Sequence, residues 1–169
     1  MEAPAYLQTI AQIGVAIAGF SGLIVTLRKG AGPLTSVQKY RLQILLSLAF
    51  GAMFLSLLPE LLLSFDIQAD RMWKVCSSVL ALYSIVFLSW LIPASLRINT
   101  IDPGIFNWPA FSRMAAGHVI VVLVQLTYLF SVFDLAATAA FSVGLIWYLL
   151  HSTQQFTRML FIRAKSDVA

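Results

Sequence analysis

Long stretches without a charged residue constrain this chain more than any other feature of its sequence. Five such stretches occupy residues 3–27, 42–59, 75–96, 114–133 and 135–157. Each approaches or exceeds the ~20 residues that an α-helix needs to cross a bilayer core about 30 Å thick. Only 11% of all residues are charged, whereas soluble domains contain roughly 25%. The windows therefore predict a multi-pass membrane protein.

The predicted fold is an all-α membrane protein, a bundle of about five transmembrane helices that forms one domain over residues 1–169. A single helix through the last two windows would be far longer than the membrane is thick. We therefore expect a tight hairpin turn at residues 131–134, with the Asp134 carboxylate capping the fifth helix. The expected spans are about 5–27, 41–63, 73–96, 112–132 and 135–160.

The distribution of basic residues predicts the orientation. With five spans, the first loop, the third loop and the C-terminus share one side of the membrane. Because Lys and Arg are enriched in cytoplasmic loops, this side is expected to be cytoplasmic and the N-terminus to lie outside. Basic residues confined to short loops argue against nucleic acid as a partner. Nine of the eleven Lys and Arg residues lie on the expected cytoplasmic side: Arg28, Lys29, Lys39, Arg41, Arg97, Arg113, Arg158, Arg163 and Lys165.

The first helix has a polar side and an adjoining strip of small residues when it is projected at about 100° per residue. The polar side either lines an aqueous path between assembled copies or hydrogen-bonds to neighbouring helices. The small strip would let another helix approach closely. Gly22 belongs to both. The polar side comprises Gln8, Gln12, Gly19, Gly22 and Thr26, and the small strip comprises Ala11, Gly14, Ala18 and Gly22.

A carboxylate, Glu60, lies near the outer end of the second expected span. It admits two interpretations. It is either an interfacial acid that reaches water or pairs with Arg71 or Lys74, or an acid at the outer mouth of a pore that attracts cations.

Two histidines, His118 and His151, fall on the fourth and fifth expected spans. The hairpin between these spans places both at a similar depth in the cytoplasmic half. Two histidines at one level could relay protons or hold a b-type haem axially. They could also form ordinary hydrogen bonds within the bundle.

Sequence motifs of catalysis are missing. The chain contains no phosphate-binding loop, no HExxH and no nucleophile elbow, and no paired carboxylates lie at mid-membrane. The single cysteine, Cys76, excludes an internal disulfide. We therefore expect no enzyme, no catalytic residue, no metal site and no cofactor.

The first helix also resembles that of a known kind of protein. Residues 10–24, which include the run AGFSGL, are similar to the first helix of some small, uncharacterised bacterial multi-pass membrane proteins. Tyr40-Arg41-Leu42 and Leu57-Leu58-Pro59-Glu60 are similar to features of the same proteins. The resemblance implies a location in the bacterial inner (plasma) membrane and assigns no site residues.

These observations favour a homo-oligomer in the lipid bilayer that forms or gates a small ion or solute pore. One chain of this size is too small to enclose a path alone, whereas several copies could surround an axis. The alternative is a non-conducting structural or accessory subunit that binds other membrane subunits. A more remote alternative is a b-type haem redox subunit.

Overall fold

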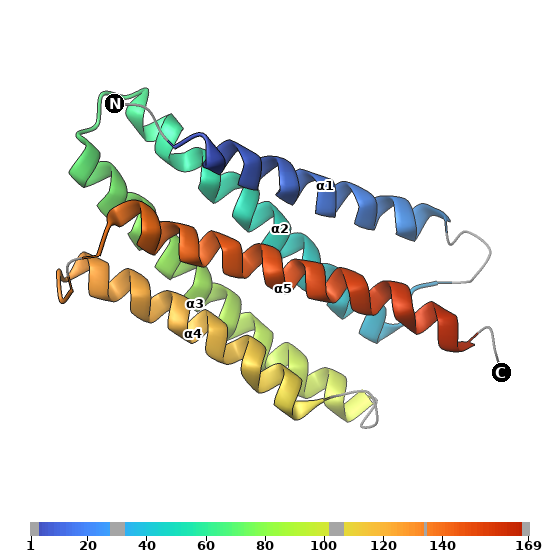
Figure 1. Ribbon diagram of the computed structural model, residues 1–169. Helices are drawn as coiled ribbons and strands as arrows, with labels where there is room; N and C mark the ends of the chain where they lie inside the picture. Colours follow the sequence, from blue (N-terminus) through green and yellow to red (C-terminus); the bar gives the residue numbers. More distant parts are fainter. Residues whose placement is uncertain (1–3, 28–32, 102–106, 134, 167–169) are drawn as a thin grey trace.

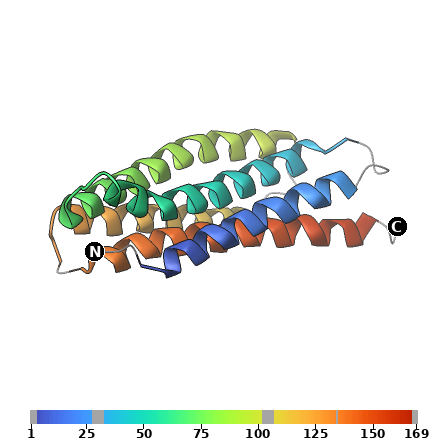
Figure 2. The same ribbon diagram turned by 90° about the horizontal axis from the view of Figure 1, so that it is seen from above.

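The structure, a computed structural model, describes residues 4–27, 33–101, 107–133 and 135–166. The regular secondary structure of these residues is entirely α-helical. The helices lie roughly along one direction, and successive helices reverse, so the described chain starts at one end of the bundle and finishes at the other (Figures 1 and 2). The five helices are α1 (Tyr6–Leu27), α2 (Ser36–Leu63), α3 (Ala69–Ile101), α4 (Trp108–Leu129) and α5 (Ala137–Ser166).

Local sequence signals explain where two of the helices begin. Thr35 caps α2 in a capping box with Gln38, in which each side chain bonds to the backbone N–H of the other residue. Asn107 caps α4 by accepting from the backbone N–H of Ala110, and Pro109 lies in the first turn, where its missing N–H costs nothing. Both helices therefore begin before the apolar spans expected from the sequence.

The turn between α4 and α5 is built without glycine. Ser131 adopts a left-handed backbone conformation with φ of 52°. The N–H groups of Ser131 and Val132 bond to the carbonyls of Tyr128 and Thr127, the pattern of a Schellman motif. This turn lies where the hairpin is expected. Asp134, the expected cap of the fifth helix, lies outside the described residues.

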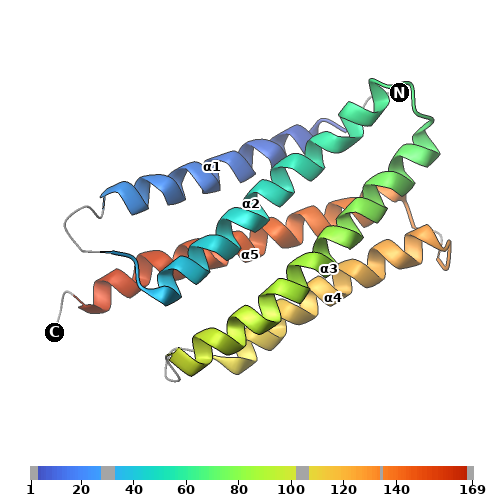
Figure 3. The same ribbon diagram turned by 180° about the vertical axis from the view of Figure 1, so that it is seen from behind.

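The fifth helix, α5, is the centre of the bundle. It contacts all four other helices, whereas α1 contacts only α2 and α5, and α4 contacts only α3 and α5. Figure 3 shows α3 and α4 running side by side, with α1 at the far side of α2. The central packing of α5 buries Phe141, Leu145 and Tyr148 completely.

The outer surface of the bundle is apolar. Large apolar side chains are exposed on every helix, for example Phe20, Phe54, Leu82, Ile120 and Leu150. Soluble proteins rarely expose apolar surface on this scale. Four helices, α1 to α4, are long and apolar enough to cross a membrane. The expectation of an all-helical membrane protein is thus confirmed at this level.

Among the described residues, α5 does not contain a stretch that is long and apolar enough to count as a membrane span. The second half of this helix contains an unbroken polar run, residues 151–155. His151, Ser152 and Gln155 from this run are buried inside the bundle. The polar run makes α5 less apolar than its neighbours. Part of this run is accommodated because it faces protein.

Candidate functional site

The polar side of α1 faces away from the rest of the chain. Gln8, Gln12 and Thr26 are exposed, and so are Gly19 and Gly22. A Cβ atom added at either glycine would meet no other atom within 4 Å. The residues expected to line a path therefore share one exposed flank of α1. At Gly19 and Gly22, no other described part of the chain covers this flank.

Six residues of this flank follow the repeat at which one helix packs along another. They are separated alternately by four and three residues, an average of 3.6, which keeps them on one side of a straight α-helix. One member, Val15, is apolar and was not among the residues expected on the polar side; it is 52% exposed. We call this set the outer stripe, and it comprises Gln8, Gln12, Val15, Gly19, Gly22 and Thr26.

The expected strip of small residues divides between two faces of α1. Ala11, Gly14 and Ala18 are buried. A Cβ atom at Gly14 would lie 2.7 Å from the carbonyl oxygen of Ala49, so the missing side chain lets α1 approach the backbone of α2. Gly22 takes no part in this packing, so its expected place in the strip is corrected and its expected place on the polar side is kept. Because the helix turns by about 100° per residue, position 22 has rotated into the outer stripe.

The carboxylate of Glu60 lies beside one end of the outer stripe. Gln8 Nε2 donates to Glu60 Oε2 over 3.5 Å, and both residues are exposed. Lys74, which the sequence offered as a partner for Glu60, instead forms an ion pair with Asp70 at 2.9 Å. The structure thus brings together the acid and the first glutamine that were singled out separately.

Two buried histidines meet inside the bundle. His118 on α4 is 0% exposed and His151 on α5 is 2% exposed. His118 Nε2 lies 3.0 Å from His151 Nδ1, and Gln155 Nε2 lies 3.1 Å from His151 Nε2. Gln155 was not assigned to this site, although its place one helical turn after His151 was a usable signal. The three side chains form one hydrogen-bonded chain.

The donor and acceptor roles within this chain are linked. When the Gln155 amide nitrogen donates to His151 Nε2, the proton of His151 resides on Nδ1 and is donated to His118 Nε2. His118 then carries its own proton on Nδ1, an atom that is buried without a partner. Turning the Gln155 amide by 180° reverses every bond in the chain and leaves His118 Nδ1 as an unpartnered acceptor.

Aromatic rings enclose the histidine pair. The His118 ring centroid lies 4.8 Å from that of Phe87, 6.1 Å from that of Trp147 and 5.7 Å from that of Tyr148. Gly117 permits the packing of Trp147, because a Cβ atom there would lie 1.9 Å from the indole ring. The pair is therefore held in an apolar, closely packed environment.

Direct contact between the two histidines does not fit a bis-histidine haem. Metal–nitrogen bonds are about 2 Å long, so axial ligands would lie about 4 Å apart with a macrocycle between them. The observed separation of 3.0 Å leaves no space for an iron atom or a flat ring between His118 and His151. We therefore set aside the expectation that they hold a haem in this arrangement.

Further polar side chains are buried near the pair. The hydroxyl of Tyr148 hydrogen-bonds with that of Ser84, and Gln125 Nε2 donates to the Ala140 carbonyl over 2.7 Å. Ser77 Oγ and Gln125 Oε1 are buried without a partner among the described residues. Buried polar atoms are usually satisfied by protein or by ordered water. The apolar interior between α3, α4 and α5 therefore contains a few further polar groups besides the two histidines.

The fold and these sites define a helical membrane protein with one exposed polar stripe and one buried polar cluster. Within the described ranges, no group of three or more His, Cys, Asp or Glu side chains could hold a metal ion. No protein-family model, curated protein or solved structure matches the chain. The resemblance of its first helix to bacterial membrane proteins stays a prediction.

Proposed function

We propose that this protein is a homo-oligomeric integral membrane protein whose copies associate through the outer stripe and form or gate a small pore. The observation that carries the proposal is the exposure of Gln8 and Gln12 on a surface that is largely apolar. Polar side chains inside a membrane usually face protein or water. A single copy supplies neither to Gln12, for which no hydrogen bond is found within the described residues.

The chemistry of the outer stripe suits association with copies of itself. A glutamine amide both donates and accepts, so Gln12 side chains from several copies can bond to one another around an axis. Gly19 and Gly22 let neighbouring backbones approach closely, as small residues do in membrane helix pairs. The alternating spacing of four and three residues is compatible with the crossing angle near 20° that is common in membrane helix bundles. Gln8, Gln12 and Thr26 would then face the axis.

The proposed topology completes this arrangement. We infer that all five helices cross the bacterial inner membrane, with the polar run of α5 shielded from lipid by its neighbours. The N-terminus lies outside and the basic end of the bundle lies in the cytoplasm. In this orientation, Glu60 from each copy stands at the outer mouth, where a ring of carboxylates attracts cations.

The first test is native mass spectrometry of the protein purified in mild detergent, followed by ion flux into liposomes. We expect one homo-oligomeric mass, and we expect Gln12→Leu to alter flux. Ser89→Leu is the matched control, because Ser89 is exposed on α3 and bonds only to its own helix. Unchanged flux through an assembled Gln12→Leu variant would refute the lining. A mass that requires foreign chains would instead support an accessory subunit.

A second candidate function, a proton relay, is favoured by the hydrogen bond between His118 and His151. With the Gln155 amide turned, His118 Nδ1 can accept a proton while its Nε2 proton passes to His151 Nδ1. His151 then releases its Nε2 proton, and both rings end neutral with exchanged tautomers. We expect His118→Phe to abolish proton flux in liposomes containing a pH-sensitive dye. Proton flux equal to that of the wild type would exclude the relay.

A further inference from the structure

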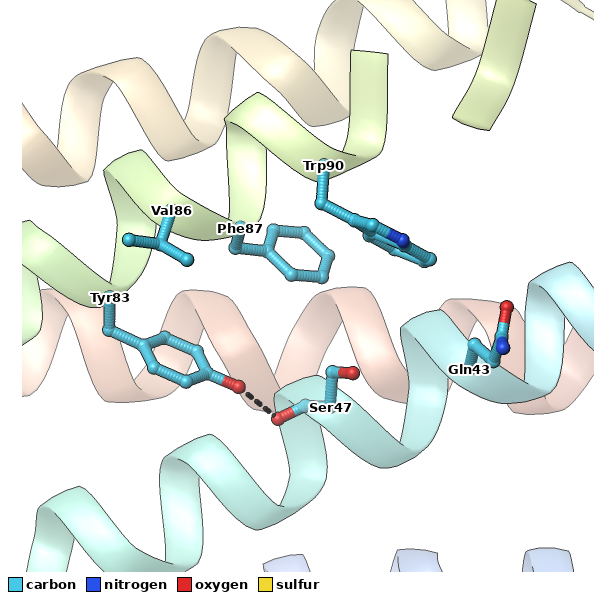
Figure 4. Close-up of a pocket in the computed structure, with 6 residues that line it drawn as sticks. All are labelled: Gln43, Ser47, Tyr83, Val86, Phe87 and Trp90. Carbon is cyan, nitrogen blue, oxygen red and sulfur yellow. Dashed lines mark hydrogen bonds between the residues drawn. The ribbon is translucent and has the colours of Figure 1, made fainter. Parts of the chain in front are cut away.

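A groove between α2 and α3 takes no part in either candidate function. It has a volume of about 350 Å³, within the range of small-molecule sites. Figure 4 shows the rings of Tyr83, Phe87 and Trp90 on α3 facing Gln43 and Ser47 on α2. The sixth lining residue, Val86 on α3, is 57% exposed, and Trp90 is 37% exposed. The groove therefore opens on the outer, apolar surface of the bundle.

Polar groups without partners line one end of this groove. The Tyr83 hydroxyl donates to the backbone carbonyl of Ser47. In contrast, no hydrogen bond among the described residues engages the Gln43 amide, the Ser47 hydroxyl or the Trp90 indole N–H. Gln43 lies only two residues past Arg41, where the apolar span begins. Its amide is thus expected at the depth of the lipid ester groups, rather than at mid-membrane.

Helical register places two cations beyond the Gln43 and Trp90 end of the groove, which we call its mouth. Lys39 precedes Gln43 by one turn on the same face of α2, and Arg97 follows Trp90 by two turns on the same face of α3. Both are exposed. Tyr40 links the two helices at this level, because its hydroxyl bonds to that of Ser95.

The acidic residues that the structure describes lie at the opposite end of the bundle. They are Glu60, Asp66 and Asp70, at the end of α2 and the start of α3. Within the described chain, the cations at the mouth of the groove therefore have no acidic side chain beside them.

We propose that this groove binds one anionic phospholipid. Along the bundle, the groove presents cations first, then hydrogen-bond donors, then aromatic rings. This order matches the phosphate, the ester carbonyls and the acyl chains of a phospholipid. Lys39 and Arg97 bind the phosphate, Gln43 and Trp90 donate to the ester carbonyls, and one acyl chain lies against Phe87. Basic pockets between membrane helices on the cytoplasmic side are typical headgroup sites. The inference requires only that the protein lies in a membrane, so it does not depend on pore formation.

The test uses the full-length protein, stripped of lipid in mild detergent and titrated while native mass spectrometry counts bound molecules. Three probes are compared: phosphatidylglycerol, phosphatidylcholine with the same acyl chains, and inorganic phosphate. We expect phosphatidylglycerol to bind once per chain and about tenfold or more tightly than phosphatidylcholine. Inorganic phosphate should not displace it, because phosphate lacks the acyl chain and the ester carbonyls.

Variants locate the binding. The double variant Lys39→Gln/Arg97→Gln should weaken phosphatidylglycerol binding about tenfold. Its matched control, Arg71→Gln/Lys74→Gln, removes the same charge at the opposite end of α3 and should change binding less than about twofold. If the first double variant does not fold, Gln43→Leu keeps both cations and should still reduce the affinity for phosphatidylglycerol.

Three outcomes would overturn the proposal. Equal binding of phosphatidylglycerol and phosphatidylcholine in several copies would indicate a non-specific lipid belt. Displacement by inorganic phosphate would indicate an anion site without a lipid. Equal weakening by the two double variants would show that overall charge, rather than the groove, determines binding.

Discussion

The outer stripe of α1 and the buried cluster around His151 are both polar, but their surroundings differ. The stripe lies on a helix that touches only α2 and α5, and Gln12 has no hydrogen bond in the described chain. The cluster lies on the helix that touches all the others, and His151 is bonded on both ring nitrogens. Polar residues therefore support internal cohesion in the cluster, whereas in the stripe they are exposed and suit the association that we propose. Substitutions in the two regions should separate these roles.

The largest effect is expected from Gly117→Ala in the buried cluster. The new Cβ atom would lie 1.9 Å from Trp147, so the indole would have to leave its place beside His118. Overpacking of this kind costs about 1–3 kcal/mol. The free energy of unfolding, measured by titrating mixed micelles with a denaturing detergent, should fall by this amount. A variant as stable as the wild type would show that Trp147 has free space to move into.

The histidine pair should give the next largest effect. His118→Leu leaves His151 Nδ1 buried without its partner, which costs about 1–3 kcal/mol. The double variant His118→Leu/His151→Leu removes both polar groups and should lose less than the sum of the single changes. The measurement is a double-mutant cycle on the free energy of unfolding. Strict additivity would contradict a stabilising bond between the two rings.

A smaller effect is expected from Tyr148→Phe. The hydroxyl that bonds with Ser84 would be lost, while the buried ring would keep its packing. Hydrogen bonds between membrane helices contribute about 0.6 kcal/mol on average, and we expect a loss of that size in the same unfolding assay. Ser84→Ala should give a similar loss, and the two changes together should cost little more than either alone. The hydroxyl also donates to the Leu80 carbonyl over 3.4 Å, and a loss above about 2 kcal/mol would mean that this second bond contributes as well.

The sequence was sufficient to predict the helical segments, because the absence of charged residues shows which segments suit a lipid environment. Charge-free windows predicted five membrane-spanning helices; the described residues form five helices, and four of these are long and apolar enough to cross a membrane. The same windows could not show that α5 is central, because its polar run is tolerated only through contacts with other helices. The position of the turn at Ser131 was predicted, but its left-handed backbone conformation was not, since no glycine marks it. Tertiary packing decides these features.

The candidate sites were predictable to a different degree. The helical period grouped Gln8, Gln12, Gly19 and Thr26 correctly on one side, because this requires only a regular helix. It could not say that Gly14 would meet α2 while Gly22 would stay exposed, since the direction of the neighbouring helix is not encoded locally. The groove formed by Tyr83, Phe87 and Trp90 was missed for the same reason. Its lining comes from two helices whose register is set by packing.

The smallest effect on the single chain is expected from Gly22→Ala in the outer stripe. A Cβ atom there meets nothing within 4 Å, and alanine favours the helix by up to about 1 kcal/mol over glycine. The stability of the monomer should therefore stay the same or rise slightly, in contrast to Gly117→Ala. If copies associate through this stripe, the added methyl group should separate the helices and lower the oligomeric fraction in native mass spectrometry. An unchanged oligomer would mean that association uses another surface, and Gly22 would then be only an exposed glycine in a lipid-facing helix.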